Sequence, residues 1–169
     1  MSLSHDLRIQ ARQLATHEPK RPKQASLRRA VSAAYYSLFH LLTEEAAQLL
    51  LKDRDVKPLQ QLLQRTFSHG VMKTAAKAFA GGNLAPTIAQ HFPGPISAGL
   101  STVATTFIDL QDARHRADYD LSYRFTRQEV LDLIQAVDDA VQCWEQIRKQ
   151  PDAKTFLVML LSYESLRKR

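Results

Sequence analysis

An apolar stripe in the second half of the chain constrains the fold more than any other feature of the sequence. Apolar side chains recur there at steps of three and four residues, the repeat that keeps one face of an α-helix apolar. The stripe consists of Ile96, Leu100, Val103, Phe107 and Leu110. No stretch of the chain alternates apolar and polar residues as a half-buried strand would. The sequence therefore predicts an all-α protein, and we expect an antiparallel helical bundle.

The same spacing, together with residues that start and end helices, predicts six helical segments. Ser4 is expected to cap the first of them, and a capping box of Thr126 and Glu129 starts the fifth. Gly70 is expected to bend or break the third. The expected helices cover residues 4–16, 23–51, 58–79, 96–119, 126–147 and 151–168.

The pattern also predicts which faces of these helices are buried. The second helix is apolar round most of its circumference between residues 30 and 42, which is typical of the central element of a bundle. In the first helix the expected inward residues are Leu3, Leu7, Ala11 and Leu14, and in the fifth they are Val130, Ile134, Val137, Val141, Trp144 and Ile147. We expect the second and fourth helices to pack together.

The apolar pattern of the C-terminal helix predicts an interface. Its apolar run, residues 156–161, covers more than one face of the helix. We therefore expect a helical bundle over residues 1–150 and a C-terminal helix, residues 151–169, that packs on the bundle or on a dimer partner. An apolar surface of that extent normally marks an interface, so a homodimer is expected.

The charge of the chain is moderately basic and unevenly distributed. The net charge is +6, with 23 lysines and arginines against 17 acidic residues. Basic residues gather between His17 and Arg29 and at the C-terminus. These clusters fit an acidic partner or RNA, but solvated side chains on a linker and a terminus are the simpler explanation.

Composition also indicates the compartment. Cys143 is the only cysteine, so no intramolecular disulfide can form, and we expect its thiol to be unreactive. The first ten residues lack the charged and then apolar layout of a signal peptide, and no apolar run is long enough to span a bilayer. We expect a soluble cytoplasmic protein that does not bind a membrane.

Arg114 and Asp118 continue the apolar stripe and are the first candidate site residues. Two charged residues on a helix face that otherwise packs in the core must form an ion pair or must line a cleft, because burying an isolated charge costs free energy. One turn apart on a helix, the two side chains can form an ion pair. The pair either closes the helix end structurally, or it presents an arginine that holds phosphate while Asp118 orients it.

The second candidate set lies on the central helix. Arg29, Tyr36 and His40 share one side of that helix at offsets of 7 and 11 residues. Tyr36 and His40 are either core residues whose polar tips are satisfied or, if they face Arg114, a hydroxyl and a general acid or base beside two cations. The latter set would suit phosphate recognition or RNA cleavage.

The sequence motifs that several common cofactor sites and enzyme classes require are absent from this sequence. There is no zinc-type Cys/His spacing, no Glu-x-x-His pair for a di-iron centre, no P-loop, no Rossmann glycine pattern and no Gly-x-Ser-x-Gly elbow. We therefore expect neither a metal nor a cofactor, and not a conventional metabolic enzyme.

Three blocks of the sequence resemble the HEPN domains, specifically the small bacterial and archaeal helical proteins of that superfamily. The blocks are AVSAAYYSLFH at residues 30–40, FSHGVMKTAAKAF at 67–79 and RHRADYD at 114–120. With the order of the helices they cover roughly residues 5–148. The resemblance implies four or five core helices in up-and-down order, commonly a homodimer, with a polar cleft between the helices that carry the first and third blocks.

The resemblance also implies a function. Many HEPN domains are metal-independent endoribonucleases that act as toxins beside a minimal nucleotidyltransferase, and others only bind nucleotide or RNA. The catalytic members carry an arginine and a histidine separated by four to six residues. Here Arg114 has Tyr119, Asp120 and Leu121 at those positions. A family arginine before the Tyr-Tyr pair is also replaced, by Ala33, and Arg29 one turn earlier is its expected substitute.

These observations leave two functions open. The first is a module that binds RNA or nucleotide phosphate and works with a partner protein, such as an antitoxin or a minimal nucleotidyltransferase. Its expected binding residues are Arg29, Tyr36, His40, Arg114, Asp118 and Tyr119. The alternative is an endoribonuclease toxin in which His40 supplies the missing imidazole and acts with Arg114 as the catalytic pair.

Overall fold

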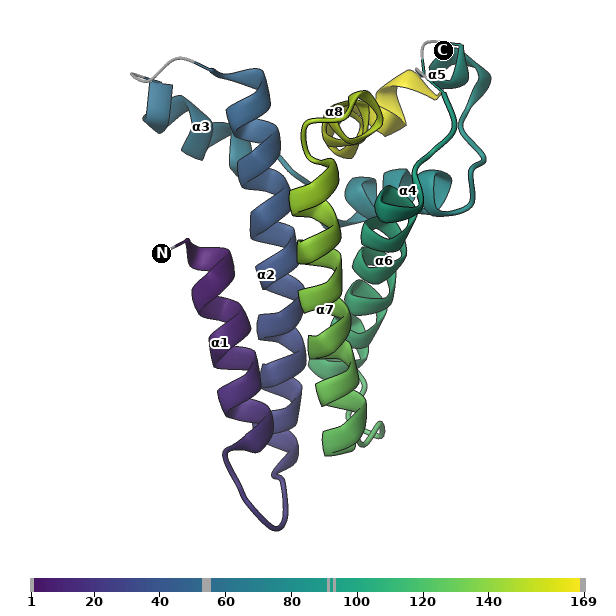
Figure 1. The fold of residues 1–169 in the computed structure, drawn as a ribbon. Helices are drawn as coiled ribbons and strands as arrows, with labels where there is room; N and C mark the ends of the chain where they lie inside the picture. Colours follow the sequence, from purple (N-terminus) through teal and green to yellow (C-terminus); the bar gives the residue numbers. More distant parts are fainter. Residues whose placement is uncertain (1, 53–55, 91, 93, 168–169) are drawn as a thin grey trace. The chain divides into compact units, whose positions relative to one another are not determined.

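The fold is helical throughout the part of the chain that the structure describes. This computed structural model describes residues 2–52, 56–90, 92 and 94–167. Within these residues the chain forms helices and no strand, which confirms the expected all-α fold. The helices are α1 (Leu3–Thr16), α2 (Gln24–Leu50), α3 (Lys57–Gln64), α4 (His69–Ala80), α5 (Pro86–Ala89), α6 (Ala98–Tyr119), α7 (Arg127–Ile147) and α8 (Pro151–Leu166), and Figure 1 shows them in sequence colours.

The helices belong to two compact units. Unit 1 is built from the described residues of Met1–His40 and from Thr106–Gln142. Unit 2 is built from the described residues of Leu41–Thr105 and Cys143–Arg169. Helices α2, α6 and α7 each contribute residues to both units.

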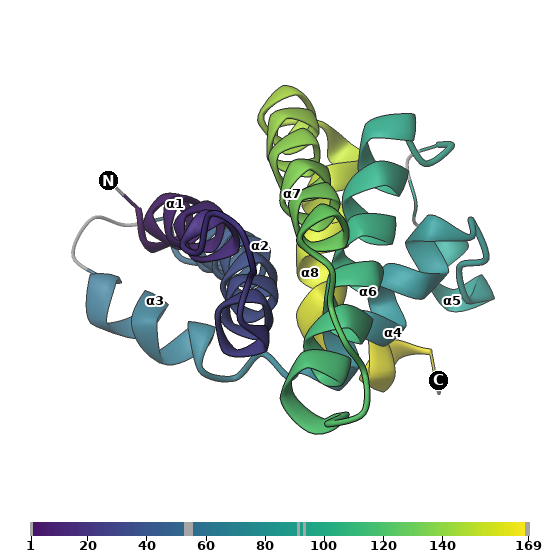
Figure 2. The ribbon, with the colours of Figure 1, turned by 90° about the horizontal axis from the view of Figure 1, so that it is seen from below.

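Unit 1 is an antiparallel bundle of α1 and parts of α2, α6 and α7. Helices α1 and α2 lie side by side in both ribbon views (Figures 1 and 2). The ring centroids of Tyr35 on α2 and Phe107 on α6 are 5.7 Å apart, so the expected contact between these two helices is confirmed. The largest completely buried side chains of the unit are Leu27, Tyr35, Leu38, Phe107, Leu110 and Ile134.

The apolar stripe of α6 is buried as its spacing predicts. Leu100, Val103, Phe107 and Leu110 are completely buried, and Ile96, which precedes the helix, is half-buried. Helix α7 also follows the prediction. The backbone N–H of Glu129 donates to Oγ1 of Thr126 at 3.2 Å, and Oε2 of Glu129 accepts from the backbone N–H of Thr126 at 3.5 Å, which is the expected capping box. All six apolar residues expected to face inward on α7 are buried.

The prediction for α1 is wrong by two residues. Ser2, not Ser4, caps the helix, because its Oγ accepts the backbone N–H of His5 at 3.3 Å. The helix therefore begins earlier, and its buried face consists of Ser4, Ala11 and Ala15. Leu3, which we expected inside, is 54% exposed. Leu7 and Leu14 are half-buried, so of the four expected inward residues only Ala11 is fully covered.

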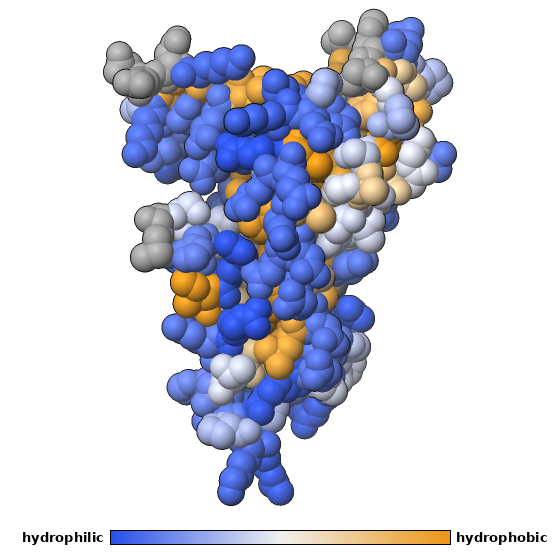
Figure 3. Space-filling view, viewed as in Figure 1, coloured by the Kyte–Doolittle hydropathy of each residue, from blue (hydrophilic) through white to orange (hydrophobic). Residues whose placement is uncertain are grey.

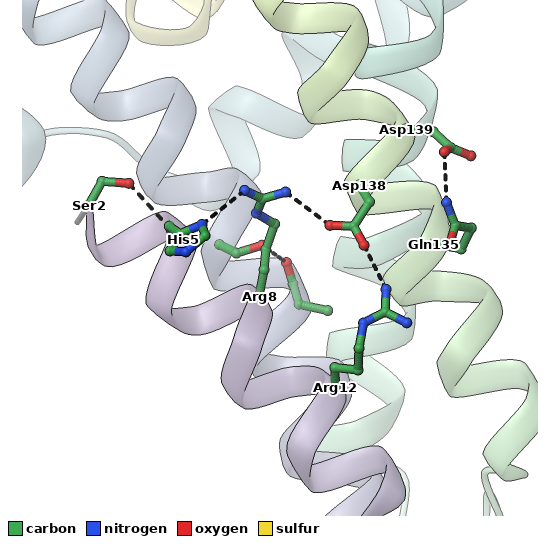
Figure 4. Close-up of polar contacts among 9 residues, drawn as sticks. Ser2, His5, Arg8, Arg12, Gln135, Asp138 and Asp139 are labelled. Atoms are coloured by element: carbon green, nitrogen blue, oxygen red, sulfur yellow. Dashed lines mark hydrogen bonds and ion pairs between the residues drawn. The ribbon is translucent and has the colours of Figure 1, made fainter.

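Two arginines join α1 to α7. Nη1 of Arg8 lies 2.9 Å from Oδ1 of Asp138, and Nη2 of Arg12 lies 2.7 Å from Oδ2 of the same carboxylate. Figure 4 shows both guanidinium groups reaching across from α1 to Asp138. One carboxylate thus satisfies two cations from successive turns of α1 and fixes the register of the two helices.

Unit 2 contains the remaining helices, with α4 packed against α8. The rings of Phe79 and Phe156 meet edge to face with centroids 5.0 Å apart. The break expected near Gly70 occurs slightly earlier, at residues 65–68, and divides the predicted third segment into α3 and α4. A short helix, α5, forms within the long loop that precedes α6.

Helix α8 buries more than one face, as its sequence predicts. Its buried residues include Asp152, Ala153, Phe156, Leu157, Met159, Leu160 and Tyr163. Oδ2 of Asp152 accepts the backbone N–H of Ser97 at 3.1 Å and so ties the start of α8 to the segment before α6. Because these faces are covered within the chain, α8 does not by itself call for a second copy. The homodimer stays a prediction.

The surface is largely hydrophilic on the face drawn in Figure 3, where hydrophobic side chains reach solvent only in small areas. Large apolar side chains that are exposed include Leu3, Ile9, Leu50, Leu59, Leu62 and Leu121. In the part of the chain that the structure describes, no helix has the length and apolar character needed to cross a bilayer.

The burial of the α6 stripe can be tested by mutation. We expect Leu110→Ala to lower the free energy of unfolding by about 2–4 kcal/mol, because it leaves a cavity beside completely buried neighbours. Arg116→Ala on the exposed side should cost no more than about 1 kcal/mol, the value of an exposed cation–π contact such as the one Arg116 makes with the ring of Tyr123. Chemical denaturation measures both values. Equal losses would show that the stripe does not face the core.

Candidate functional site

A cleft lined by charged and aromatic side chains lies between the first part of α2 and the last turns of α6, inside unit 1. Its volume is about 530 Å³, within the usual size range of small-molecule sites. The lining residues are Ala25, Arg28, Arg29, Ser32, Tyr36, Arg114, Ala117, Asp118 and Tyr119. Three arginines thus share the cleft with one carboxylate, so the site favours an anion.

Arg114 lines this cleft and contacts two of the other lining residues. Its Nε lies 2.6 Å from Oδ2 of Asp118, the ion pair that the spacing of four residues predicts. Its Nη2 donates to the phenol oxygen of Tyr36 at 3.3 Å. The two charged side chains are 19% and 26% exposed, so they are shielded from bulk water but still reachable by a ligand.

Aromatic rings surround the guanidinium of Arg114. Its central carbon lies 6.0 Å from the ring centroid of Tyr35, 5.7 Å from that of Tyr36 and 5.8 Å from that of Tyr119. These distances are within the range of cation–π attraction. Burial raises the pKa of the Tyr35 phenol above its ordinary value, and the nearby Arg114 lowers it by less, so this tyrosine stays neutral at physiological pH.

Ser32 is a site residue that the sequence analysis missed. Its hydroxyl donates to Oδ1 of Asp118 at 2.9 Å, while Oδ2 of the same carboxylate faces Arg114. Ser32 therefore fixes the carboxylate that orients the arginine. It lies three residues after Arg29 and four before Tyr36 on the same side of α2, so helical spacing from either residue could have found it.

Arg28 is a second missed residue, and its role is structural. Its guanidinium donates to backbone carbonyls of four residues at and beyond the carboxyl end of α6. The acceptors are Arg116 at 3.3 Å, Ala117 at 2.8 Å, Asp120 at 2.8 Å and Tyr123 at 2.6 Å. The last carbonyls of a helix have no partner within the helix, and a cation is stabilised by the negative end of the helix dipole. Arg28 therefore holds the last turn of α6 against α2.

The chain after α6 is fixed by Asp120. Its Oδ1 accepts the hydroxyl of Ser122 at 2.6 Å and the backbone N–H groups of Ser122 and Tyr123 at 3.0 and 3.2 Å. These hydrogen bonds, that of the Ser122 hydroxyl first, hold the pKa of the Asp120 carboxyl below its usual value. The turn presents the carbonyls of Asp120 and Tyr123 to Arg28.

The predicted site residues separate into those that line the cleft and one that does not. Arg29, Tyr36, Arg114, Asp118 and Tyr119 all line it. Among the described residues, the exposed Arg29 has no hydrogen-bond or ion-pair partner, so its guanidinium is open to a ligand.

His40 is not among the lining residues. Its ring stacks on that of Tyr36 with centroids 6.0 Å apart, and it meets Phe39 edge to face at 5.5 Å. His115 does not line the cleft either, but its ring centroid lies 5.0 Å from that of the lining residue Tyr119.

Comparison of the chain with protein-family models, with curated proteins and with solved structures found no match. Two of the three sequence blocks described above, residues 30–40 and 114–120, carry lining residues of the cleft.

The role of Arg28 predicts a stability difference between neighbouring arginines. Arg28→Ala should lower the free energy of unfolding by about 1–3 kcal/mol, because it removes charge-assisted hydrogen bonds and leaves helix-end carbonyls unpaired. Arg29→Ala removes the same charge from an exposed side chain and should cost less than about 0.5 kcal/mol. Urea denaturation of the two variants measures this difference. Indistinguishable values would contradict a structural role for Arg28.

Proposed function

We propose that this chain is a HEPN-like helical module that binds RNA or nucleotide through phosphate at the cleft between α2 and α6. It would act with a partner protein, such as an antitoxin or a minimal nucleotidyltransferase. The homodimer expected from the sequence belongs to the same proposal, as does a cytoplasmic location.

This proposal rests on how the two cleft arginines are held: Arg114 is fixed by neighbouring side chains, and Arg29 is open to a ligand. Asp118 and Tyr36 hold the Arg114 guanidinium from two sides, so it needs little reorganisation to meet an anion. Arg29 on the facing helix adds a second cation without a protein partner among the described residues. Two guanidinium groups on opposite walls of a cleft suit the several oxygens of a phosphate, which accept forked hydrogen bonds.

The alternative is an endoribonuclease in which His40 acts as general acid or base. What favours it is that the His40 ring stacks on Tyr36, whose phenol contacts Arg114. What weakens it is that His40 does not line the cleft, whereas a general base must come within hydrogen-bond distance of the proton it moves. Binding without cleavage is therefore the function that the geometry supports better.

The test compares two arginines of α6 in RNA binding. Affinity of the intact protein for a single-stranded oligoribonucleotide is measured over a series of salt concentrations, in wild type, Arg114→Ala and Arg116→Ala. We expect Arg114→Ala to weaken binding about tenfold or more, the value of a charge-assisted hydrogen bond, and to lower the salt slope by about 1. Arg116→Ala removes the same charge from outside the cleft and should have a much smaller effect.

Two results would reject the proposal. Equal losses in the two variants would mean that RNA follows the overall basic charge and not this cleft. Cleavage of the oligonucleotide by wild type that both Arg114→Ala and His40→Ala abolish would instead establish the ribonuclease.

A further inference from the structure

The ring of Tyr119 is an unusual feature of the cleft. Tyr119 is the last residue of α6 and one of the residues that line the cleft, yet it is 65% exposed. Leu121, two residues later in the chain, is 88% exposed. The ring of Tyr119 is therefore accessible to a ligand that enters the cleft.

The neighbours of Tyr119 hold its ring without covering it. The guanidinium carbon of Arg114 lies 5.8 Å from the ring centroid, and the ring of His115 lies 5.0 Å away at an angle of 49°. Because Arg114 also bonds Asp118 and Tyr36, the ring is anchored beside a group whose position is already determined. A ring that is anchored and still exposed loses little freedom when a flat ligand stacks on it.

Phosphate recognition alone does not explain this arrangement. The oxygens of a phosphate bind guanidinium and N–H donors and gain nothing from an aromatic face. Every nucleobase has a π face, and stacking on tyrosine, histidine or arginine is the common way in which unpaired bases are held. A nucleotide presents both chemistries a few ångströms apart, as does the pair of Arg114 and Tyr119.

We propose that Tyr119, supported by His115, is a stacking surface for a nucleobase, and that the ligand is an unpaired base carrying phosphate and not a simple phosphate compound. This inference rests on the proposed function, because Arg114 and Arg29 would hold the phosphate of the same ligand. It assigns the base to the exposed ring of Tyr119 at the end of α6.

The experiment compares ligands with and without a base. Isothermal titration calorimetry of the intact protein measures affinity for ATP, for inorganic tripolyphosphate and for a single-stranded pentaadenylate. Tripolyphosphate carries the phosphate chain without the base and is at least as highly charged, so tighter binding of ATP cannot come from charge. The proteins are wild type, Tyr119→Ala, Tyr119→Phe and Arg114→Ala, each checked for folding by circular dichroism.

We expect wild type to bind ATP about tenfold more tightly than tripolyphosphate, the value of one stacked base. Tyr119→Ala should remove this preference and leave tripolyphosphate affinity unchanged, while Tyr119→Phe should keep it. Tighter binding of ATP than of tripolyphosphate supports a single nucleotide as ligand. A loss of affinity in Tyr119→Ala that is seen only with pentaadenylate supports an RNA strand.

The inference fails if Tyr119→Ala binds ATP and pentaadenylate as wild type does. The exposed ring would then be a contact for a protein partner and not for a base. It also fails if Tyr119→Ala weakens tripolyphosphate and the base-bearing ligands equally, because the ring would then only support Arg114. Failure of the proposed function is a separate result: Arg114→Ala would bind every ligand as wild type does, or wild type would bind none of them.

Discussion

The guanidinium of Arg28 binds the carbonyl oxygens at the carboxyl end of α6, and the geometry of the cleft depends on this interaction. A helix end is its least ordered part, because its last carbonyls lack partners within the helix. Arg114, Asp118 and Tyr119 all lie in the last two turns of α6, so their positions are only as well defined as that end. Arg28 on α2 therefore orders the α6 wall of the cleft, which contributes Arg114, Asp118 and Tyr119.

The polar residues at the end of the apolar stripe are stabilised by contacts that leave the site open to an anion. Arg114 is shielded by tyrosine rings and paired with Asp118, and Ser32 satisfies the other oxygen of that carboxylate. A half-buried ion pair of this kind is weak support for stability, because desolvation offsets much of its attraction. The hydrogen bonds that Tyr36 makes with Arg114 and Ser32 makes with Asp118 fit a pair whose position is set for a ligand.

Sequence periodicity predicted the large features of the fold, and it failed where a contact depends on distant residues. The limits of α2, α6 and α7 and the buried face of α7 followed from apolar spacing and a capping box, which are local signals. Local signals also predicted the Arg114–Asp118 pair. The cap of α1 was misplaced because Ser2 and Ser4 are both acceptable N-caps and only burial separates them. The role of Arg28 could not be predicted, since its acceptors are backbone atoms some 90 residues away in the chain.

The central claim is that a phosphate-bearing ligand binds at Arg114, and NMR of the arginine side chains tests it most directly. The Nε–Hε resonances of the labelled protein are followed while a single-stranded oligoribonucleotide is added. We expect the Arg114 resonance to shift and saturate together with that of Arg29, whereas the resonances of Arg8 and Arg12, which bind Asp138 on α7, stay unchanged. Saturable shifts at Arg8 and Arg12 with an unchanged Arg114 would contradict it.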